Sequence, residues 1–364
     1  MRNILRIITR ITNKIQFNLG IKRAITQLLK FIINTKGPWM VRINPVNFNC
    51  NHDCIMCWRR LLTNKERKKH IKKDLRSLDL KDYKKLFSQL PLSVHTINVT
   101  GGGEPLIHNQ ILEILKLIKR YNYHGYLITN GVLLNKKIKT LYRMDWDFIR
   151  ISFHAADRYS YKRVHNRDDF EKVISNIRLI NKYRKRFFKD IMRISLLYVI
   201  QKFNYSKINK FVGLAENLKV DEIEFDNLIP LNKEVLLSLN QIKKVTKDLK
   251  KVANSCQIAN NANEVIMRYR EFYNNNSLSR EFSNILRTRF LGKKCDVVEN
   301  SVFITSQGII QPCCLLSTTT GNIKKNRFMR IWNSKRYKDL RFNLNQGKFY
   351  PDCYKYCSYN LQDI

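Results

Sequence analysis

The amino-acid sequence predicts an α/β protein, in which a partial (β/α)6 TIM-like barrel precedes a small C-terminal cysteine-rich domain. Segments with strand and helix patterns alternate from Trp39 to about Pro230, which is typical of a parallel sheet with helices outside it. Three cysteines lie close together near the start of this region, and five more lie in the last part of the chain. The 364 residues suffice for one large domain and one small one. The four expected parts are a basic amphipathic N-terminal segment, the barrel, a helical connection and the cysteine-rich domain, at residues 1–37, 38–231, 232–292 and 293–364.

The expected strands of the barrel are short and rich in β-branched residues. They lie near residues 40–48, 96–101, 125–130, 147–153, 191–199 and 222–227. The helices between them lie near residues 79–90, 109–122, 135–143, 169–186 and 206–218. Two of these helices show a buried face at i, i+3, i+4, i+7 spacing: Ile111, Ile114, Leu115 and Ile118, and Val173, Ile174, Ile177 and Ile180. Sites in such barrels lie at the carboxyl ends of the strands, so we expect the chemistry there.

Three cysteines follow the first expected strand at the spacing C-x3-C-x2-C. They are Cys50, Cys54 and Cys57. A [4Fe–4S] cube normally takes four thiolates, so three on one loop leave one iron open to a substrate or cofactor. The alternatives are a zinc knuckle and scattered buried thiols. A zinc site usually pairs its cysteines as C-x2-C with a fourth ligand nearby, and His52 lies between two of the cysteines, where it would complete such a site only with steric strain.

This cysteine motif resembles that of the radical S-adenosylmethionine (radical SAM) superfamily, whose core fold is the partial barrel. The resemblance implies that the open iron chelates S-adenosylmethionine, and that an electron from the cluster cleaves it to a 5′-deoxyadenosyl radical. It extends to Gly102, Gly103 and Glu104, which follow the second strand where the family has a G-G-E segment that contacts the methionyl amine. A plain turn is the alternative for these glycines. The resemblance covers residues 39–230 and 293–364.

Other family positions follow the remaining strands. Met56 precedes the third cysteine, where the family usually has an aromatic or apolar residue against the adenine, and Asn130 belongs to a T-N-G segment after the third strand. Ser152 and His154 end the fourth strand, where ribose and carboxylate contacts are typical. The segment 197–204 ends the fifth strand, in a region that usually touches adenine. A locally bonded hydroxyl is the alternative for Ser152, and a structural role is the alternative for His154.

The C-terminal residues carry a second set of cysteines. Residues 303–313 have the pattern of two short strands joined by a turn with glycine, and a helical pattern follows near 331–340. This order resembles the SPASM and Twitch auxiliary-cluster domains of radical SAM enzymes, and five cysteines fit the shorter Twitch form with one cluster. The resemblance implies four thiolate ligands for this auxiliary [4Fe–4S] cluster: Cys295, Cys313, Cys353 and Cys357. A zinc site is the alternative.

Two cysteines of the chain are left without a ligand role. Cys314 is the spare thiol of the C-terminal set, because adjacent residues of a strand point to opposite faces and only one of the pair can ligate easily. It remains the alternative to Cys313, and the C-x3-C spacing at the end of the chain departs from the family's usual C-x2-C. Cys256 is expected to be a small apolar residue in a helix.

The composition bears on location and partners. Nine cysteines, an odd number and mostly in ligand spacings, argue against disulfides and for a reducing compartment, so we expect a cytoplasmic protein. The net charge of +39 would attract nucleic acid, anionic lipid or an acidic substrate. The charge is spread along the chain, and Lys, Asn and Ile are abundant together, as a coding bias would also produce. No specific nucleic acid is predicted.

The first 37 residues contain no Asp or Glu. Five isoleucines and four basic residues would lie on opposite faces of a helix there: Ile4, Ile7, Ile8, Ile11 and Ile15, and Arg2, Arg6, Arg10 and Lys14. This pattern is that of a basic helix at an anionic membrane surface. The alternative is a helix that packs its isoleucines on the barrel. A signal peptide is not expected, because charges interrupt every apolar run.

We therefore interpret the sequence as a radical SAM enzyme with one auxiliary [4Fe–4S] cluster. It would abstract hydrogen from an unidentified substrate after a donor such as flavodoxin or ferredoxin supplies the electron. Dehydrogenation of a small molecule is the first hypothesis for the reaction, and peptide modification by a SPASM-type maturase is the second. A non-catalytic iron–sulfur protein that binds nucleic acid is the alternative of another class, and the segment at Gly102–Glu104 argues against it.

Overall fold

The computed structural model describes residues 37–74, 77–186, 192–227, 233–274, 293–357 and 362–363. The basic helix expected in the N-terminal segment lies outside these residues. The described residues contain no helix that is long and apolar enough to cross a membrane.

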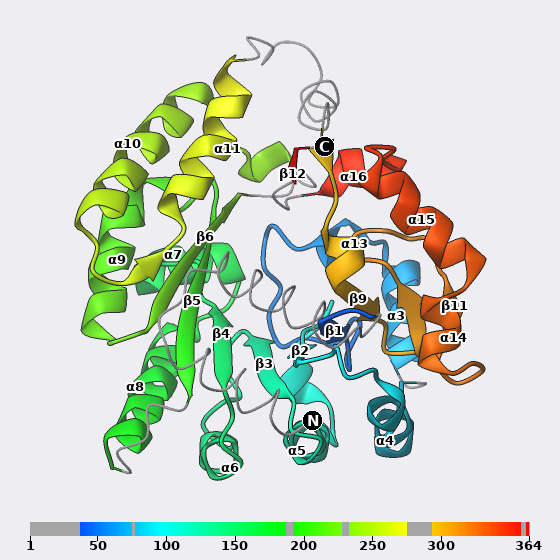
Figure 1. The fold of residues 1–364 in the computed structure, drawn as a ribbon. Helices are drawn as coiled ribbons and strands as arrows, with labels where there is room; N and C mark the ends of the chain where they lie inside the picture. Colours follow the sequence, from blue (N-terminus) through cyan, green and yellow to red (C-terminus); the bar gives the residue numbers. More distant parts are fainter. Residues whose placement is uncertain are drawn as a thin grey trace.

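The barrel is built on parallel strands that follow one another in chain order around an arc (Figure 1). These strands are β1 Met40–Ile43, β2 Thr96–Val99, β3 His124–Thr129, β4 Phe148–Ser152, β5 Arg193–Ile200 and β6 Glu222–Asn227. A short strand, β7 Ala259–Asn260, pairs in parallel with β6. The six strands expected from the sequence are thus confirmed, within a few residues at their ends. The first is shorter than expected, since β1 ends at Ile43 and residues 44–49 form the loop that leads to the cysteines.

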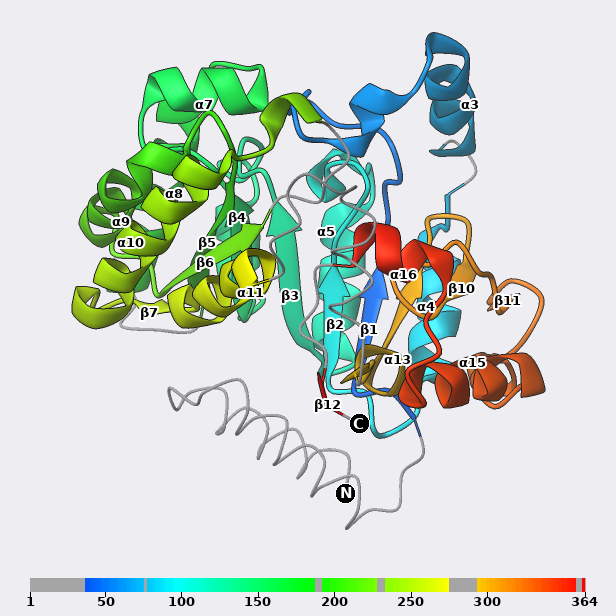
Figure 2. The same cartoon turned by 90° about the horizontal axis from the view of Figure 1, so that it is seen from above.

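Helices cover the outer face of the arc (Figure 2). They are α4 Leu80–Gln89, α5 Ile111–Arg120, α6 Ile138–Arg143, α8 Phe170–Arg186, α9 Ile208–Asn217 and α10 Leu239–Ser255. The helix α11 Ala262–Asn274 packs against α10 and β6, and its Arg268 pairs with Asp226 on the inner side of β6. The isoleucine, leucine and valine faces predicted for α5 and α8 are buried in the core. Capping boxes fix the starts of two of the helices, through Asp79 and Asp82 at α4 and through Ser238 and Gln241 at α10. Two helices near the mouth, α3 Asn64–Asp74 and α7 Arg158–His165, were not predicted, because no long apolar face marks them.

The two faces of each strand differ sharply, as β6 shows. Ile223 and Phe225 point outward and are buried against the helices. Glu222, Glu224 and Asp226 alternate with them and therefore lie on the opposite, inner face of the barrel. The inner face of β6 is thus charged along the length of the strand.

The C-terminal region continues the same sheet. β9 Ser301–Ile304 and β10 Ile309–Gln311 form the expected hairpin, and β9 also pairs in parallel with β1. The sheet therefore runs in the order β11-β10-β9-β1-β2-β3-β4-β5-β6-β7, where β11 is Gly321–Asn322. Remaining elements of this region are β8 Lys293–Lys294, α13 Val297–Asn300, α14 Phe328–Trp332, α15 Lys335–Asn345, α16 Pro351–Tyr356 and β12 Gln362–Asp363. Figure 1 shows α14 and α15 on the β1 side of the arc, away from α9 and α10.

One glycine of β3 has no space for a side chain. A Cβ atom at Gly125 would lie 2.5 Å from the ring of Trp146, which is fully buried between α6 and β4. Trp146 is also held by its indole N–H, which donates to the carbonyl of Phe148 at 3.0 Å. The ring therefore cannot move aside without losing this bond.

We expect Gly125→Ala to destabilise the fold by ~1–3 kcal/mol, because the added methyl group overpacks a rigid contact. The measurement is the free energy of unfolding in denaturant. Gly213→Ala is the matched control, since nothing lies within 4 Å of a Cβ at this position inside α9. That change should be neutral or should stabilise by ~0.5–1 kcal/mol. Equal stability of the two variants would show that Trp146 does not confine β3.

Candidate cofactor sites

The cysteine loop lies directly against the glycine loop that follows β2. The backbone N–H of Gly103 donates to the carbonyl of Val46 at 3.0 Å, and that of Glu104 donates to the carbonyl of Asn49 at 2.8 Å. A Cβ atom at Gly103 would lie only 2.2 Å from the Asn49 carbonyl oxygen, and one at Gly102 would clash equally with the backbone at residue 47. The glycines are therefore required for the contact between the two loops, whatever ligand they also approach.

Glu104 ties this glycine loop to the end of β3. Its carboxylate accepts bonds from the Thr129 hydroxyl at 2.7 Å, from the backbone N–H of Asn130 at 2.8 Å and from that of Leu106 at 3.0 Å. The residue is 2% exposed, and burial raises the pKa of its carboxyl, while these three bonds oppose the rise. The carboxylate is thus engaged by the protein itself. Its three accepted bonds position the two strand ends and occupy most of the ~4 lone-pair positions of a carboxylate.

Each of the three loop thiols has a nitrogen neighbour. The Asn130 side chain donates to Cys50 Sγ at 3.8 Å, and Arg59 Nε donates to Cys57 Sγ at 3.3 Å. His165 Nδ1 lies 3.3 Å from Cys54 Sγ. None of the nine cysteines is in a disulfide. Burial raises the pKa of the Cys50 and Cys54 thiols, so both favour the neutral form until a cation binds.

Arg59 closes the cysteine loop and was missed in the sequence. Its guanidinium is buried, and it donates to the carbonyls of Phe48 at 3.2 Å and His52 at 2.7 Å in addition to Cys57. These bonds join the start of the loop to its end. A basic residue two positions after the third cysteine was the available signal, but it is one of many in so basic a chain.

Three histidines form a buried row behind Cys54. The rings of His154 and His165 stack with centroids 5.3 Å apart, and His52 lies 5.0 Å from His165. Burial lowers the pKa of His52 to about 4 and that of His165 to about 3, so both rings are neutral at pH 7. His154 Nδ1 accepts the backbone N–H of Val199 at 3.1 Å, which favours a structural role for this ring.

The other residues singled out in the sequence lie at the same mouth. Asn130 also donates to the Asn51 side chain at 2.8 Å, so it holds the cysteine loop to the end of β3. Gln201, after β5, donates to Met56 Sδ at 3.8 Å. Ser152 is half-buried at the end of β4. The predicted residues therefore lie on the cysteine loop or near the carboxyl ends of neighbouring strands, and Glu104 and His154 bond to the protein itself.

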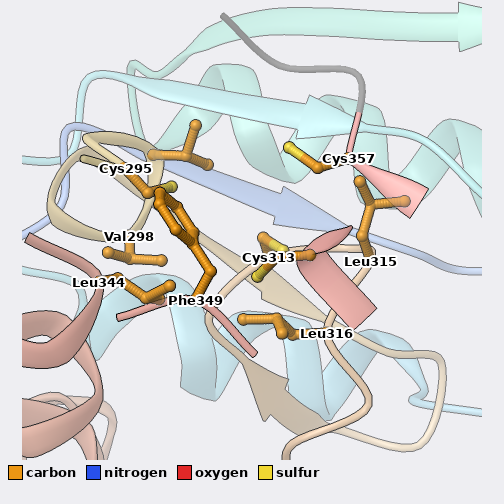
Figure 3. A pocket seen from close by; sticks show the side chains of 10 residues that line it. Cys295, Val298, Cys313, Leu315, Leu316, Leu344, Phe349 and Cys357 are labelled. Carbon is orange, nitrogen blue, oxygen red and sulfur yellow. The ribbon is translucent and has the colours of Figure 1, made fainter. Parts of the chain in front are cut away.

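The C-terminal thiols converge in a second place. Cys295, Cys313, Cys353 and Cys357 line one pocket, whose remaining walls are apolar (Figure 3). The lining residues besides the cysteines are Val297, Val298, Leu315, Leu316, Leu344 and Phe349. Burial raises the pKa of Cys295 to about 11 and that of Cys353 to about 12. Four thiols in a dry apolar pocket fit a cluster with thiolate ligands at all four irons.

The two cysteines without a ligand role lie apart from this pocket. Cys314 is exposed, whereas Cys313 lines the pocket, which favours Cys313 as the ligand. The pair lies in a turn after β10, so the turn and not a strand separates the two side chains. Cys256 is half-buried and caps the C-terminal end of α10, one residue beyond the helix in which it was expected.

Charged groups on the inner face of the barrel lie below the mouth. Glu224 pairs with Arg150, whose guanidinium also lies 5.1 Å from the centre of the Tyr126 ring. Asp226 pairs with Arg268 of α11 at 3.1 Å. Burial raises the pKa of Glu224 to about 7, although Arg150 opposes the rise. Sequence patterns did not reveal this group, because its members come from four different elements.

Comparisons with known proteins agree with both sites. A family model of the radical SAM superfamily matches residues 44–215, and a model of the SPASM iron–sulfur cluster-binding domain matches residues 295–359. A probable GTP 3′,8-cyclase of Saccharolobus islandicus is 27% identical over 168 residues, which are 45% of this chain and 52% of the relative. The chain thus spans about half the length of that curated relative. A tungsten-containing aldehyde ferredoxin oxidoreductase cofactor-modifying protein of Pyrococcus furiosus is 24% identical over 327 residues, 85% of this chain and 84% of the relative.

Solved structures share the fold. Streptococcus suis SuiB bound to its precursor peptide SuiA has a TM-score of 0.60 at 18% identity, over 90% of this chain and 73% of that one. The anSMEcpe protein with bound AdoMet and a peptide has a TM-score of 0.56 at 16% identity, over 88% and 86%. With the two family matches and two groups of thiols that fit iron–sulfur clusters, the chain belongs to the radical SAM superfamily and carries a SPASM-type domain, and these two domains imply S-adenosylmethionine and two [4Fe–4S] clusters as its cofactors.

Proposed function

We propose that this enzyme dehydrogenates a small polar substrate, such as an alcohol or an amine, held on the inner face of the barrel. The observation that carries the proposal is the half-buried charged group around Glu224, below the carboxyl ends of the strands where the cysteine loop lies. When bound, the cofactors supply a 5′-deoxyadenosyl radical that removes one hydrogen atom from the substrate. Oxidation of an alcohol to a carbonyl then requires that one proton and one electron also leave.

The residues of the mouth hold the first cluster and the S-adenosylmethionine. Cys50, Cys54 and Cys57 are the proposed iron ligands, and no fourth cysteine accompanies them on the described loop. The backbone from Gly102 to Glu104 presents its polar groups to the methionyl end, since the glycines bring it close to the cysteine loop. Met56, Asn130 and Ser152 are the proposed contacts to the rest of the cofactor, and the chain segment near His154 shapes the same edge.

Glu224 is the proposed proton acceptor. A carboxyl with a pKa near 7 can take a proton at neutral pH and release it again, which is the property required of a general base. Glu224 lies on the inner face of β6, and its side chain is 25% exposed, so a substrate can reach it. Arg150, its partner, would balance the negative charge when the acceptor is ionised.

A cluster bound by the C-terminal thiols would accept the electron that leaves the substrate during oxidation. We propose that Cys295, Cys313, Cys353 and Cys357 fill all four ligand positions of the auxiliary cluster, which leaves no iron open for a substrate. An apolar pocket also excludes water from the thiolates. Such a site suits electron transfer better than it suits holding a substrate. An external donor such as flavodoxin or ferredoxin would return electrons to the first cluster.

Peptide modification is the second candidate function. The structural neighbours that hold peptides favour it, although their identity of 16–18% shows the fold alone. A test is to add the small-molecule and the peptide fractions of a cell extract to the reduced enzyme and S-adenosylmethionine, and to measure 5′-deoxyadenosine. The small-molecule fraction should raise its formation and yield a carbonyl product that hydrazine traps. Stimulation by the peptide fraction alone would favour the second function.

Iron content tests the ligand assignment. Anaerobically reconstituted protein should hold about eight irons, as two cubes of four. Changing Cys50, Cys54 and Cys57 together to Ala should leave about four, and so should changing Cys313 and Cys353. Cys314→Ala is the matched control and should keep all the iron, because its thiol lies outside the pocket. Loss of a cluster in that variant would reverse the choice between the adjacent cysteines.

Glu104 tests the positioning of the S-adenosylmethionine site. Glu104→Gln keeps the size of the side chain but replaces one acceptor oxygen by an NH2 donor, which then faces an existing donor. We expect weaker binding of S-adenosylmethionine by about tenfold, as for the loss of a hydrogen bond to a charged group, and normal iron content. Equilibrium dialysis with labelled cofactor measures the affinity. An unchanged affinity would show that the junction of β2 and β3 does not shape this site.

The pH profile tests Glu224 as the proton acceptor. The acceptor must be deprotonated to act, so the rate of substrate oxidation should rise as pH increases through about 7 and then level off. Glu224→Gln should abolish oxidation while S-adenosylmethionine cleavage without substrate continues. Glu222→Gln, two residues earlier on the same face of β6, is the matched control and should keep the rise. A rise that persists in Glu224→Gln would assign it to another group.

A further inference from the structure

A second group of metal-binding side chains lies behind the cysteine loop. One ligand atom each from His52, Cys54 and His165 lies within 4.8 Å of the other two. The two histidines are 3% and 1% exposed. The reaction proposed above uses neither ring.

The contacts of both rings leave one nitrogen of each for a metal. His165 Nε2 lies 2.6 Å from the carbonyl oxygen of Phe153, which only accepts, so Nε2 carries the hydrogen. The lone pair of Nδ1 then faces Cys54 Sγ at 3.3 Å. His52 Nε2 lies 3.3 Å from the carboxylate of Asp169, and neither of the two buried ring nitrogens of His52 has a hydrogen-bond partner among the described residues. A carbonyl or carboxylate at the second ring nitrogen is the usual support of a histidine that binds metal.

We propose that, in the chain without its first cluster, His52, Cys54 and His165 bind one zinc ion. One thiolate and two imidazole nitrogens are a common zinc ligand set, and the sulfur and nitrogen atoms of a tetrahedral site lie ~3.6 Å apart. The observed 3.3 Å between Cys54 Sγ and His165 Nδ1 therefore needs only a small adjustment.

The zinc ion and the first cluster exclude each other, because both need Cys54. This consequence rests on the proposed cluster ligands, whereas the zinc site itself does not. Zinc bound at His52 and His165 would hold Cys54 on the side of the histidines. Zinc bound at this site would thus prevent assembly of the first iron–sulfur cluster.

The test measures zinc bound by the cluster-free full chain under anaerobic conditions, after equilibration with Zn²⁺ and dialysis. Zinc bound at the C-terminal thiols would add to the total, so each variant is compared with the parent chain. His52→Gln and His165→Gln should each bind one equivalent less. The double variant Cys50→Ala, Cys57→Ala should bind as much as the parent. Retained zinc in both histidine variants, or loss in the double cysteine variant, would overturn the proposal.

A milder variant keeps the test decisive if the histidine variants do not fold. Asp169 lies at the surface side of His52 and touches no other ligand, and Asp169→Asn should weaken zinc binding about 10–100-fold while circular dichroism stays unchanged. Unchanged zinc affinity in this variant would count against the site. Co²⁺ is a second probe, because a single thiolate and two imidazoles give a visible spectrum distinct from that of four thiolates.

Competition with iron tests the consequence. Chain loaded with zinc should take up about four irons fewer than the zinc-free chain, and removal of zinc should restore them. Full iron uptake with zinc still bound would refute mutual exclusion. If zinc does not bind but eight irons load and S-adenosylmethionine is cleaved, the zinc site is wrong and the radical SAM function stands.

Discussion

The close contact between two backbone loops is the constraint on which the cofactor site depends. The loop from Val46 to Asn49 and the glycine loop from Gly101 to Gly103 approach so closely that no side chain fits between them. This contact fixes the cysteines at the carboxyl edge of β1 and β2, where parallel strands leave their polar ends unpaired. The glycines are therefore required for the packing of the two loops, and this packing also leaves their backbone close to any ligand of the cysteine loop.

Buried polar side chains make this contact rigid. Glu104 and Asn130 join the glycine loop, the end of β3 and the cysteine loop, while Arg59 joins the two ends of the cysteine loop. A buried polar group is costly when unpaired and directional when paired, so each of these residues specifies one arrangement. These bonds therefore hold the three thiols of the cysteine loop in one arrangement.

The sheet also links the two thiol sites. Because β9 pairs with β1, the C-terminal hairpin is an extension of the barrel and shares its core. The smaller cluster of apolar residues around Val298 and Leu340 then packs beside the four C-terminal thiols. One continuous hydrogen-bonded sheet therefore carries elements that support both sites.

The sequence by itself determined the strand order of the barrel, the two cysteine groups and the superfamily. The reason is that the hydrophobic period and the spacing of the cysteines are patterns among neighbouring residues, which can be read directly from the chain. It also named the residues that gather at the mouth, from Cys50 to Ser152. Only the tertiary structure decided that Glu104 is engaged by the protein, that Arg59 closes the loop and that His165 meets Cys54. It also decided that Arg150, Glu224 and Arg268 meet inside the barrel. These contacts join residues as far as 111 positions apart in the chain, and their partners are chosen by strand register and burial, which no local pattern records.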